Sequence, residues 1–216
     1  MLLITSAIVF GFLSHPALHL ARKEIREAKP AFSILIDYPD IPGAADFNRA
    51  VHKIVDPLVD RFKGDLAKPP LPGAPASKAY LNGSYTAAAL KSGVVSVLLE
   101  WEEYTPGAAH PTGGMASINY DGRNNRVLAL SDLFQPGSDY VSRLSQLASD
   151  SLKRRPNANG ALVRQGAGPL ETNFKVFTLT DGTLVLHFPT YQVGTRVDGP
   201  EKVDIPLDSL HSLLRK

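Results

Sequence analysis

The residues best suited to chemistry lie in one loop of this chain. The loop runs from Tyr104 to Pro111 with the sequence YTPGAAHP, and its histidine, His110, lies between Pro106 and Pro111. Proline restricts the backbone, so the loop should keep its shape without a ligand. A stiff loop that carries a tyrosine and a histidine is suited to forming a contact surface, and loops of this kind often carry function.

Three glutamates come directly before this loop, in the segment EWEEY that ends at Tyr104. In a strand, Glu100 and Glu102 share one face and Glu103 lies on the other. One interpretation is a paired general acid and base. The interpretation that we favour is a solvated acidic edge, which discourages strands from aggregating. The acidic cluster would also attract a basic partner, although the whole chain is nearly neutral.

A second candidate segment is FPTYQ, from Phe188 to Gln192. Pro189 ends or interrupts a strand, so that Tyr191 projects from a stiffened backbone. Side chains that lose little entropy on binding are good contact residues. The equally open alternative is a tyrosine buried at the end of a strand.

Sequence patterns of common catalytic and metal sites are absent. The chain has no G-x-S-x-G, H-x-H or H-E-x-x-H sequence. A triad of Ser117, His110 and Asp121 is conceivable, but a loop histidine bonded to a nearby backbone group is the commoner arrangement. We therefore expect no catalytic residue, no metal site and no cofactor.

Composition narrows the class of protein. The 216 residues suggest one domain or two small ones. The 23 basic and 21 acidic residues are too balanced to indicate a nucleic-acid partner. The absence of cysteine excludes disulfides, thiolate metal sites and a cysteine nucleophile. The 17 glycines and 17 prolines favour a strand-rich fold with tight connections.

The first residues form an apolar run from Leu2 to Leu13. A transmembrane helix needs about 20 apolar residues, so this run is too short for a stable membrane span. It predicts a signal peptide over residues 1–21, with cleavage at Ala17 or Ala21, and hence a periplasmic or secreted protein. A buried first strand or helix is the alternative. Residues 22–30 are expected to form a charged connector.

The rest of the chain predicts a single α+β domain over residues 31–216, with antiparallel strands in hairpins. Two main amphipathic helices are expected, one with Asp46 as its N-cap and one capped by Ser138, followed by a short C-terminal helix. Hairpin signals lie at residues 91–93, 121–125 and 181–182. Expected strands cover residues 31–38, 80–90, 94–104, 115–120, 126–130, 174–180, 183–188 and 202–205, and the closing helix covers 207–214.

Several short motifs occur in a characteristic order along the chain. They are Tyr-Pro-x-Ile from Tyr38, Phe-Asn at 47–48, Ser-Val at 96–97, the 104–111 loop, Asn-Tyr-Asp at 119–121, Leu-x-Asp-Leu-Phe at 130–134 and Phe-x-x-Tyr-Gln-Val at 188–193. In this order they resemble the extracytoplasmic C-terminal domain of RsiV-type anti-sigma factors. Similar domains precede the catalytic module of some peptidoglycan deacetylases.

The resemblance implies recognition. In the anti-sigma factors this domain binds lysozyme, and Pro189 and Tyr191 match a position of the lysozyme-contacting surface. The sequence shows neither a sigma-binding segment nor a deacetylase domain, so we expect a free-standing exported domain. Its partner would be a lysozyme-like muramidase or peptidoglycan. The expected partner-binding residues are Tyr104, His110, Pro111, Pro189, Tyr191 and Glu102.

The alternative function belongs to a different class. It is a hydrolase or deacetylase of cell-wall glycan that uses His110 and nearby carboxylates. Turnover that depends on His110 would distinguish this enzyme from a binding domain.

Overall fold

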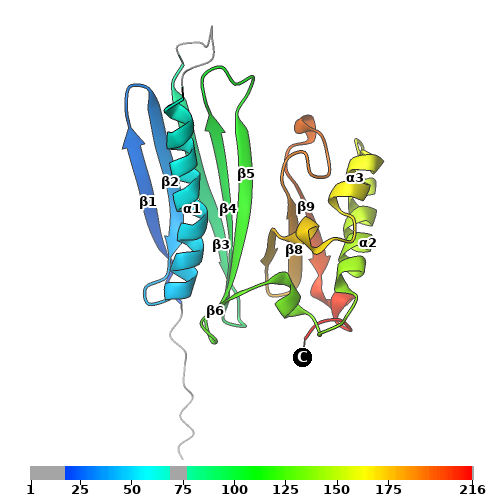
Figure 1. Ribbon diagram of the computed structural model, residues 1–216. Coiled ribbons are helices and arrows are strands. Elements are labelled where there is room, and N and C mark those ends of the chain that lie inside the picture. Colours follow the sequence, from blue (N-terminus) through cyan, green and yellow to red (C-terminus); the bar gives the residue numbers. More distant parts are fainter. Residues whose placement is uncertain (1–17, 69–76, 216) are drawn as a thin grey trace, which may run out of the picture.

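The structure is a computed structural model, and it describes residues 18–68 and 77–215. Two sheets form its framework (Figure 1). The first has six strands in the order β1-β2-β3-β4-β5-β6, and the second has three in the order β7-β8-β9. The first 17 residues of the expected signal peptide lie outside the described residues.

The strands of the larger sheet are β1 (Ala21–Ala28), β2 (Phe32–Asp40), β3 (Ala79–Ala89), β4 (Val94–Tyr104), β5 (Thr112–Asp121) and β6 (Arg126–Leu128). One face is covered by the helix α1 (Ala45–Leu66), as Figure 1 shows. The helix buries an apolar stripe at three- and four-residue spacing against alternate residues of the strands. Its buried residues are Phe47, Val51, Val55, Leu58, Val59 and Phe62.

The expected N-cap of α1 was wrong. Ala44 occupies the cap position without a side-chain hydrogen bond, and Asp46 lies inside the first turn. There it forms an ion pair with Arg49, with 2.7 Å between Oδ1 and Nη1. A carboxylate in the first turn still interacts favourably with the helix dipole.

Residues 22–30 are not a connector, because most of them form β1, which pairs antiparallel with β2 from Ala21↔Asp40 to Ala28↔Ser33. Charged side chains dominate this strand because it is the edge of the sheet, where charge protects against aggregation. Leu18 and Leu20 also pack against the first core. Cleavage at Ala21 would therefore remove native contacts, whereas cleavage at Ala17 would leave them intact.

The prediction of an α+β fold is confirmed, but the strands are not all antiparallel. β2 and β3 pair in parallel, from Phe32↔Ala79 to Ile36↔Gly83. The connection between them contains α1, and a long crossover of this kind permits parallel pairing. The hairpins predicted at 91–93, 121–125 and 181–182 all join antiparallel neighbours.

The second sheet consists of β7 (Phe177–Leu179), β8 (Thr183–Phe188) and β9 (Glu201–Pro206). Helices α2 (Tyr140–Lys153) and α3 (Gly160–Gly166) lie on the side of this sheet away from the first sheet (Figure 1). Buried Leu144, Leu152 and Val163 pack there against the sheet in a second core. Short 3-10 turns span Leu130–Leu133, Glu171–Phe174, Arg196–Asp198 and Leu207–Leu210.

Three details of this half differ from the sequence prediction. Asp139, not Ser138, is the residue before α2, and the Ser138 hydroxyl donates to the Gln135 carbonyl instead. The expected closing helix is a 3-10 turn with a few further turn residues. α3 was not predicted, although Asn159 caps it by accepting from two backbone N–H groups. No helix among the described residues is long and apolar enough to cross a membrane.

Candidate functional site

The two sheets meet along a ladder of residue pairs on β4 and β5. These side chains lie on the face opposite α1, because side chains alternate along a strand. From one end to the other the pairs are Ser96↔Asn119, Leu98↔Ser117, Glu100↔Met115 and Glu102↔Gly113.

One end of the ladder is closed by buried hydrogen bonds to β7. Ser96 and Asn119 are 2% and 1% exposed, and the Ser96 hydroxyl donates to Asn119 Oδ1 at 2.7 Å. Ser96 Oγ also accepts from the Leu179 backbone N–H at 2.8 Å. Asn119 Nδ2 donates to the Phe177 carbonyl at 2.9 Å. The backbone edge of β7 is thus paired with side chains, which satisfies groups that burial would otherwise leave without partners.

The other end of the ladder opens into a cleft of about 410 Å³ between the two sheets. Five of the six predicted partner-binding residues line it. The cleft is lined by Glu100, Trp101, Glu102, His110, Pro111, Thr112, Gly113, Gly114, Met115, Pro189, Thr190, Tyr191, Arg196 and Pro200. The structure therefore brings the two segments singled out in the sequence to one place.

His110 lies at the rim of this cleft and is half-buried. Its Nδ1 is 2.8 Å from the Pro111 carbonyl oxygen, so in the neutral ring Nδ1 carries the proton and donates. Nε2 is then left as an acceptor. The commoner arrangement expected for this histidine, a bond to nearby backbone, is confirmed.

Tyr191 has an unusual backbone conformation. Its φ is 74°, and the Gln192 backbone N–H donates to the Pro189 carbonyl at 3.0 Å. A positive φ at the third residue of such a turn normally requires glycine. A bulky residue there is strained, and such strain is concentrated at functional sites. The residue is 57% exposed, so burial in the core does not explain this conformation.

The side chain of Gln192 holds this turn in place. Its Nε2 donates to the carbonyls of Gly166 and Asn173, both at 2.8 Å. Gly166 is the last residue of α3, and a Cβ atom at that position would collide with the Gln192 carbonyl. The close approach of α3 to the turn therefore requires glycine.

The acidic cluster is smaller than the sequence suggested. Glu103 lies on the α1 face and forms a double ion pair with Arg61, at 2.7 and 2.8 Å. Its charge is thereby neutralised. Glu102 accepts from the Tyr80 hydroxyl at 2.8 Å, and Glu100 is exposed. The attraction for a basic partner thus falls to Glu100 and Glu102.

Tyr104 is the one predicted residue that does not line the cleft. Its ring stacks on Tyr80 of β3, with centroids 5.9 Å apart and 28° between the ring planes. The hydrogen bond to Glu102, followed by burial, raises the pKa of Tyr80. This phenol therefore stays protonated and keeps donating to the carboxylate.

The conceivable triad is not assembled. Ser117 Oγ accepts from the Phe177 backbone N–H, and Asp121 accepts from the backbone of Arg123 and Asn124. His110 lies beyond the other end of β5, with its own partner at Pro111. Within residues 18–68 and 77–215, no group of three or more His, Asp or Glu side chains could hold a metal ion.

Tyr80 and Arg196 were not among the predicted site residues, and no role was predicted for Gln192. Tyr80 could have been found, because a hairpin centred on Ser92 places it opposite Tyr104. Nothing in the sequence marks Arg196, which reaches the cleft from the turn before β9.

Several motif residues hold the fold together. Asn48 makes two bonds to the backbone of Ile41, at 2.9 and 3.0 Å, and fixes the turn into α1. Asp132 accepts from the Ala129 N–H at the start of a 3-10 turn. The motifs that carry the resemblance are therefore explained by the fold at least as much as by the candidate site.

Comparison with known proteins relates the chain to a family and to one curated protein. Residues 131–208 match the family described as "Protein of unknown function (DUF3298)". This range contains α2, α3 and the second sheet. The chain is 28% identical over 138 residues to "Peptidoglycan-N-acetylmuramic acid deacetylase PdaC" of Bacillus subtilis (strain 168), which is 63% of this chain. It spans only 29% of the length of that protein.

Two solved structures share the fold. A DUF3298 family protein of Pseudomonas aeruginosa PAO1 has a TM-score of 0.62 and 17% identity, over 92% of this chain and 94% of that chain. A DUF3298 family member of Bacteroides fragilis NCTC 9343 has a TM-score of 0.60 and 18% identity, over 93% and 94%. The anti-sigma part of the resemblance stays a prediction. The chain thus carries a match to DUF3298 in residues 131–208, and most of it has the fold of solved DUF3298 proteins.

Proposed function

We propose that this protein is an exported, non-catalytic recognition domain whose cleft binds a partner of the cell envelope. The partner would be a lysozyme-like muramidase or peptidoglycan. The observation that carries the proposal is the convergence of the 104–111 loop and the Pro189–Gln192 turn on one cleft. Two segments far apart in the sequence, each singled out for its residue types, supply its two walls.

The strained tyrosine supports a contact role. Holding a bulky residue at positive φ costs on the order of 1–3 kcal/mol, and the surroundings must enforce it. Here Gln192 and the carbonyls that it contacts enforce the turn, while the ring of Tyr191 stays exposed. An aromatic side chain already held in position loses little entropy on binding and can dominate an interface.

The charges on the cleft favour a basic partner. Glu100 and Glu102 lie on one wall, and a cationic protein such as lysozyme would be drawn to them mainly through its association rate. Arg196 lies on the opposite wall and would select for a carboxylate on the partner.

The curated relative supports a place outside the cytoplasm. Its name assigns it to deacetylation of peptidoglycan, and the shared segment is a minor part of its length. We infer a periplasmic or secreted location and a link to the cell wall for this protein as well.

Tyr191→Ala tests the proposal. We expect calorimetry to detect binding of lysozyme or soluble peptidoglycan fragments to the wild type, and a loss of at least about 2 kcal/mol in the variant. Leu170→Ala is the matched control, because Leu170 is 63% exposed and does not line the cleft. Absence of binding to both ligands, or equal affinity of Tyr191→Ala and wild type, would show that the cleft is not the site.

The alternative function, a cell-wall glycan hydrolase or deacetylase, has one observation in its favour. His110, with Nε2 available as an acceptor, lines the same cleft as Glu100 and Glu102. Assays on peptidoglycan and acetylated chito-oligomers distinguish the two functions. Turnover that His110→Ala abolishes would establish the enzyme and overturn the binding domain.

A further inference from the structure

A second surface lies beside the cleft, on the face of the larger sheet opposite α1. It consists of Tyr80, Tyr104, Glu100 and Glu102, and we refer to these four residues as the tyrosine platform. Tyr80 lies opposite Tyr104 across the β3–β4 pair, and the two carboxylates precede Tyr104 at alternate positions of β4. Glu100 and Glu102 also line the cleft, so the two surfaces are continuous.

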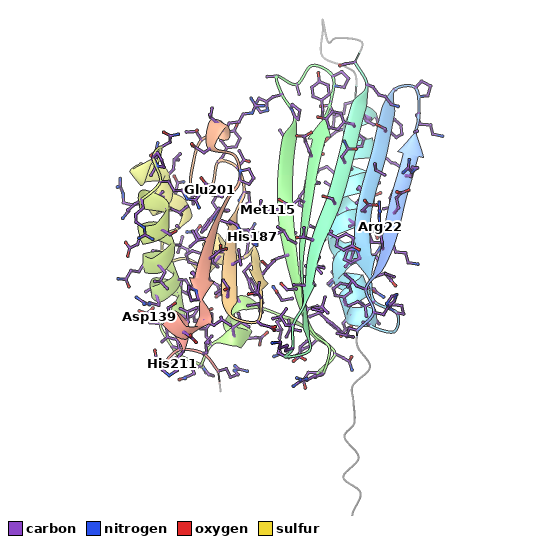
Figure 2. All side chains as sticks on the ribbon, turned by 180° about the vertical axis from the view of Figure 1, so that it is seen from behind. Arg22, Met115, Asp139, His187, Glu201 and His211 are labelled. Carbon is purple, nitrogen blue, oxygen red and sulfur yellow. The ribbon has the colours of Figure 1, made fainter. Side chains whose placement is uncertain are left out.

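Among the described residues, no helix covers this face, on which Glu100 and Glu102 are exposed and Tyr80 and Tyr104 are half-buried. α1 covers the other face, and the contacts of β7 with this sheet are mainly with β4 and β5. Figure 2 shows the sheet from behind, with α1 visible beyond the strands and no helix in front of them. Across from the two glutamates, Asn82 and Ser84 of β3 are exposed as well.

The two rings are fixed before any ligand binds. The rings are stacked, with centroids 5.9 Å apart and 28° between their planes, so each ring supports the other. The Tyr80 hydroxyl donates to Glu102 at 2.8 Å, and the Tyr104 hydroxyl lies 3.4 Å from Ser77 Oγ. Because the rings are already ordered, a ligand would not have to immobilise them.

The platform carries uncompensated negative charge. Among the described residues, neither Glu100 nor Glu102 forms an ion pair, and Lys78, which precedes β3, pairs with neither. The acidic groups farther along the same face are already paired, as Arg22 with Asp37 and Arg26 with Glu24. Aromatic rings beside free carboxylates are the chemistry that recognises an ammonium group.

We propose that the tyrosine platform binds a glycan whose sugars carry free amino groups. The apolar C–H face of a sugar would lie on the stacked rings, its ammonium would pair with Glu100, and Asn82 and Ser84 would face its hydroxyls. An open sheet face that carries aromatic rings suits a chain of sugar rings better than the single side chain of a basic protein, which a pocket would enclose. Recognition of ammonium by the rings adds a cation–π contribution that an acetylated amine lacks.

The reaction that supplies such a glycan is hydrolysis of an N-acetyl amide. Water cleaves the amide C–N bond, acetate leaves, and the amine remains on the sugar. This is the class of reaction in the name of the curated relative. The platform would thus bind the product of a deacetylase, a role that goes beyond the proposed function, on a surface that shares Glu100 and Glu102 with the cleft.

Oligomers of β-1,4-linked glucosamine and of N-acetylglucosamine provide the test, titrated into the whole protein by calorimetry at low and at moderate salt. We expect the free-amine oligomer to bind at least about tenfold more tightly than the acetylated one. Its affinity should fall with salt. Tyr104→Ala should weaken binding about tenfold, and Glu100→Gln about fivefold.

A matched control tests whether the position of the carboxylate matters. Asp150→Asn removes one exposed carboxylate on α2 and should leave glycan affinity unchanged. Glu100→Gln alters an exposed side chain, so it keeps the test valid if Tyr104→Ala folds poorly.

Equal affinity for the two oligomers, no binding at low salt, or full affinity in Glu100→Gln would overturn the inference. Loss of lysozyme affinity in Tyr104→Ala without any glycan binding would overturn it in favour of a basic protein. Each of these results leaves the Tyr191 test of the cleft standing.

Discussion

The two ends of the β4–β5 ladder differ in how they meet the second sheet. At the closed end, the side chains of Ser96 and Asn119 form hydrogen bonds with each other and with the backbone of β7. At the open end, Glu100, Glu102 and Gly113 line a cleft. Four residues farther along β4, from Glu100 onward, contact between the sheets is replaced by the cleft.

The difference follows from side-chain size and charge. Serine and asparagine are short enough to let β7 approach and can pair both its donors and its acceptor. Two neighbouring carboxylates cannot be buried without cations, so the second sheet is kept away there. A fold can therefore fasten two sheets and leave a binding cleft between them by changing residues at alternate positions of one strand.

Asn119→Ala should break the closed end and have the largest effect on stability. It leaves the Phe177 carbonyl and the Ser96 hydroxyl without Asn119, in a buried place. Each unsatisfied buried group costs about 1–3 kcal/mol, so we expect unfolding free energy to fall by roughly 3 kcal/mol in a urea titration.

Asn157→Ala is the control for this change, because Asn157 is exposed in the loop after α2. It should alter stability by less than about 0.5 kcal/mol. If Asn119→Ala were equally mild, the hydrogen bonds at the closed end would not be what fastens the sheets.

Tyr191→Gly should sharpen the contrast at the open end, because stability and binding change in opposite directions. Glycine adopts positive φ freely, so relief of strain should raise the unfolding free energy by about 1 kcal/mol. The greater conformational entropy of the unfolded glycine variant should reduce this gain. Partner binding should be lost together with the ring. Tyr191→Ala, which keeps the strain, should not be stabilised, and a stabilised alanine variant would show that strain is not the cause.

Local patterns were enough to predict most of the fold. Hairpins at tight turns and the apolar stripe from Phe47 to Phe62 gave the right elements, because turn chemistry and helical period act over a few residues. The parallel β2–β3 pair was missed because it depends on how α1 packs, which is a long-range property. β1 was missed because its charges, typical of an edge strand, are also typical of a connector.

The candidate site could be predicted only in part. His110 and Tyr191 stood out by residue type, and the fold brings them to one cleft. The distribution of charge could not be foreseen, because Glu103 meets Arg61 across 42 positions of sequence. The strain at Tyr191 was equally hidden, since no local pattern shows that a tyrosine will occupy a position suited to glycine.

The smallest effect should come from His187, which tests a polar contact of β7 away from the closed end. Its Nε2 is 2.8 Å from the hydroxyl of Thr178, the residue between Phe177 and Leu179, and the contact is half-buried. Burial lowers the pKa of His187, and nearby Lys202 lowers it further against an opposing effect of Asp204. The unfolded chain, with a histidine pKa of about 6.5, therefore takes up the proton first. Stability should be full above about pH 6.5 and decrease as pH falls toward the folded pKa.

Urea titrations between about pH 8 and about pH 5 measure this dependence above the range in which the aspartates titrate, below about pH 4. His187→Gln should flatten the decrease that begins near pH 6.5. His52→Gln, at an exposed position of α1, should retain it. If the two variants lost the slope equally, the proton would be taken up elsewhere and the β7–β8 contact would carry no pH dependence. If only His187→Gln loses it, then β7 is held by two kinds of polar contact. The buried pairs of Ser96 and Asn119 have no ionisable group and stay insensitive to pH, while the half-buried histidine weakens as the solution becomes acidic.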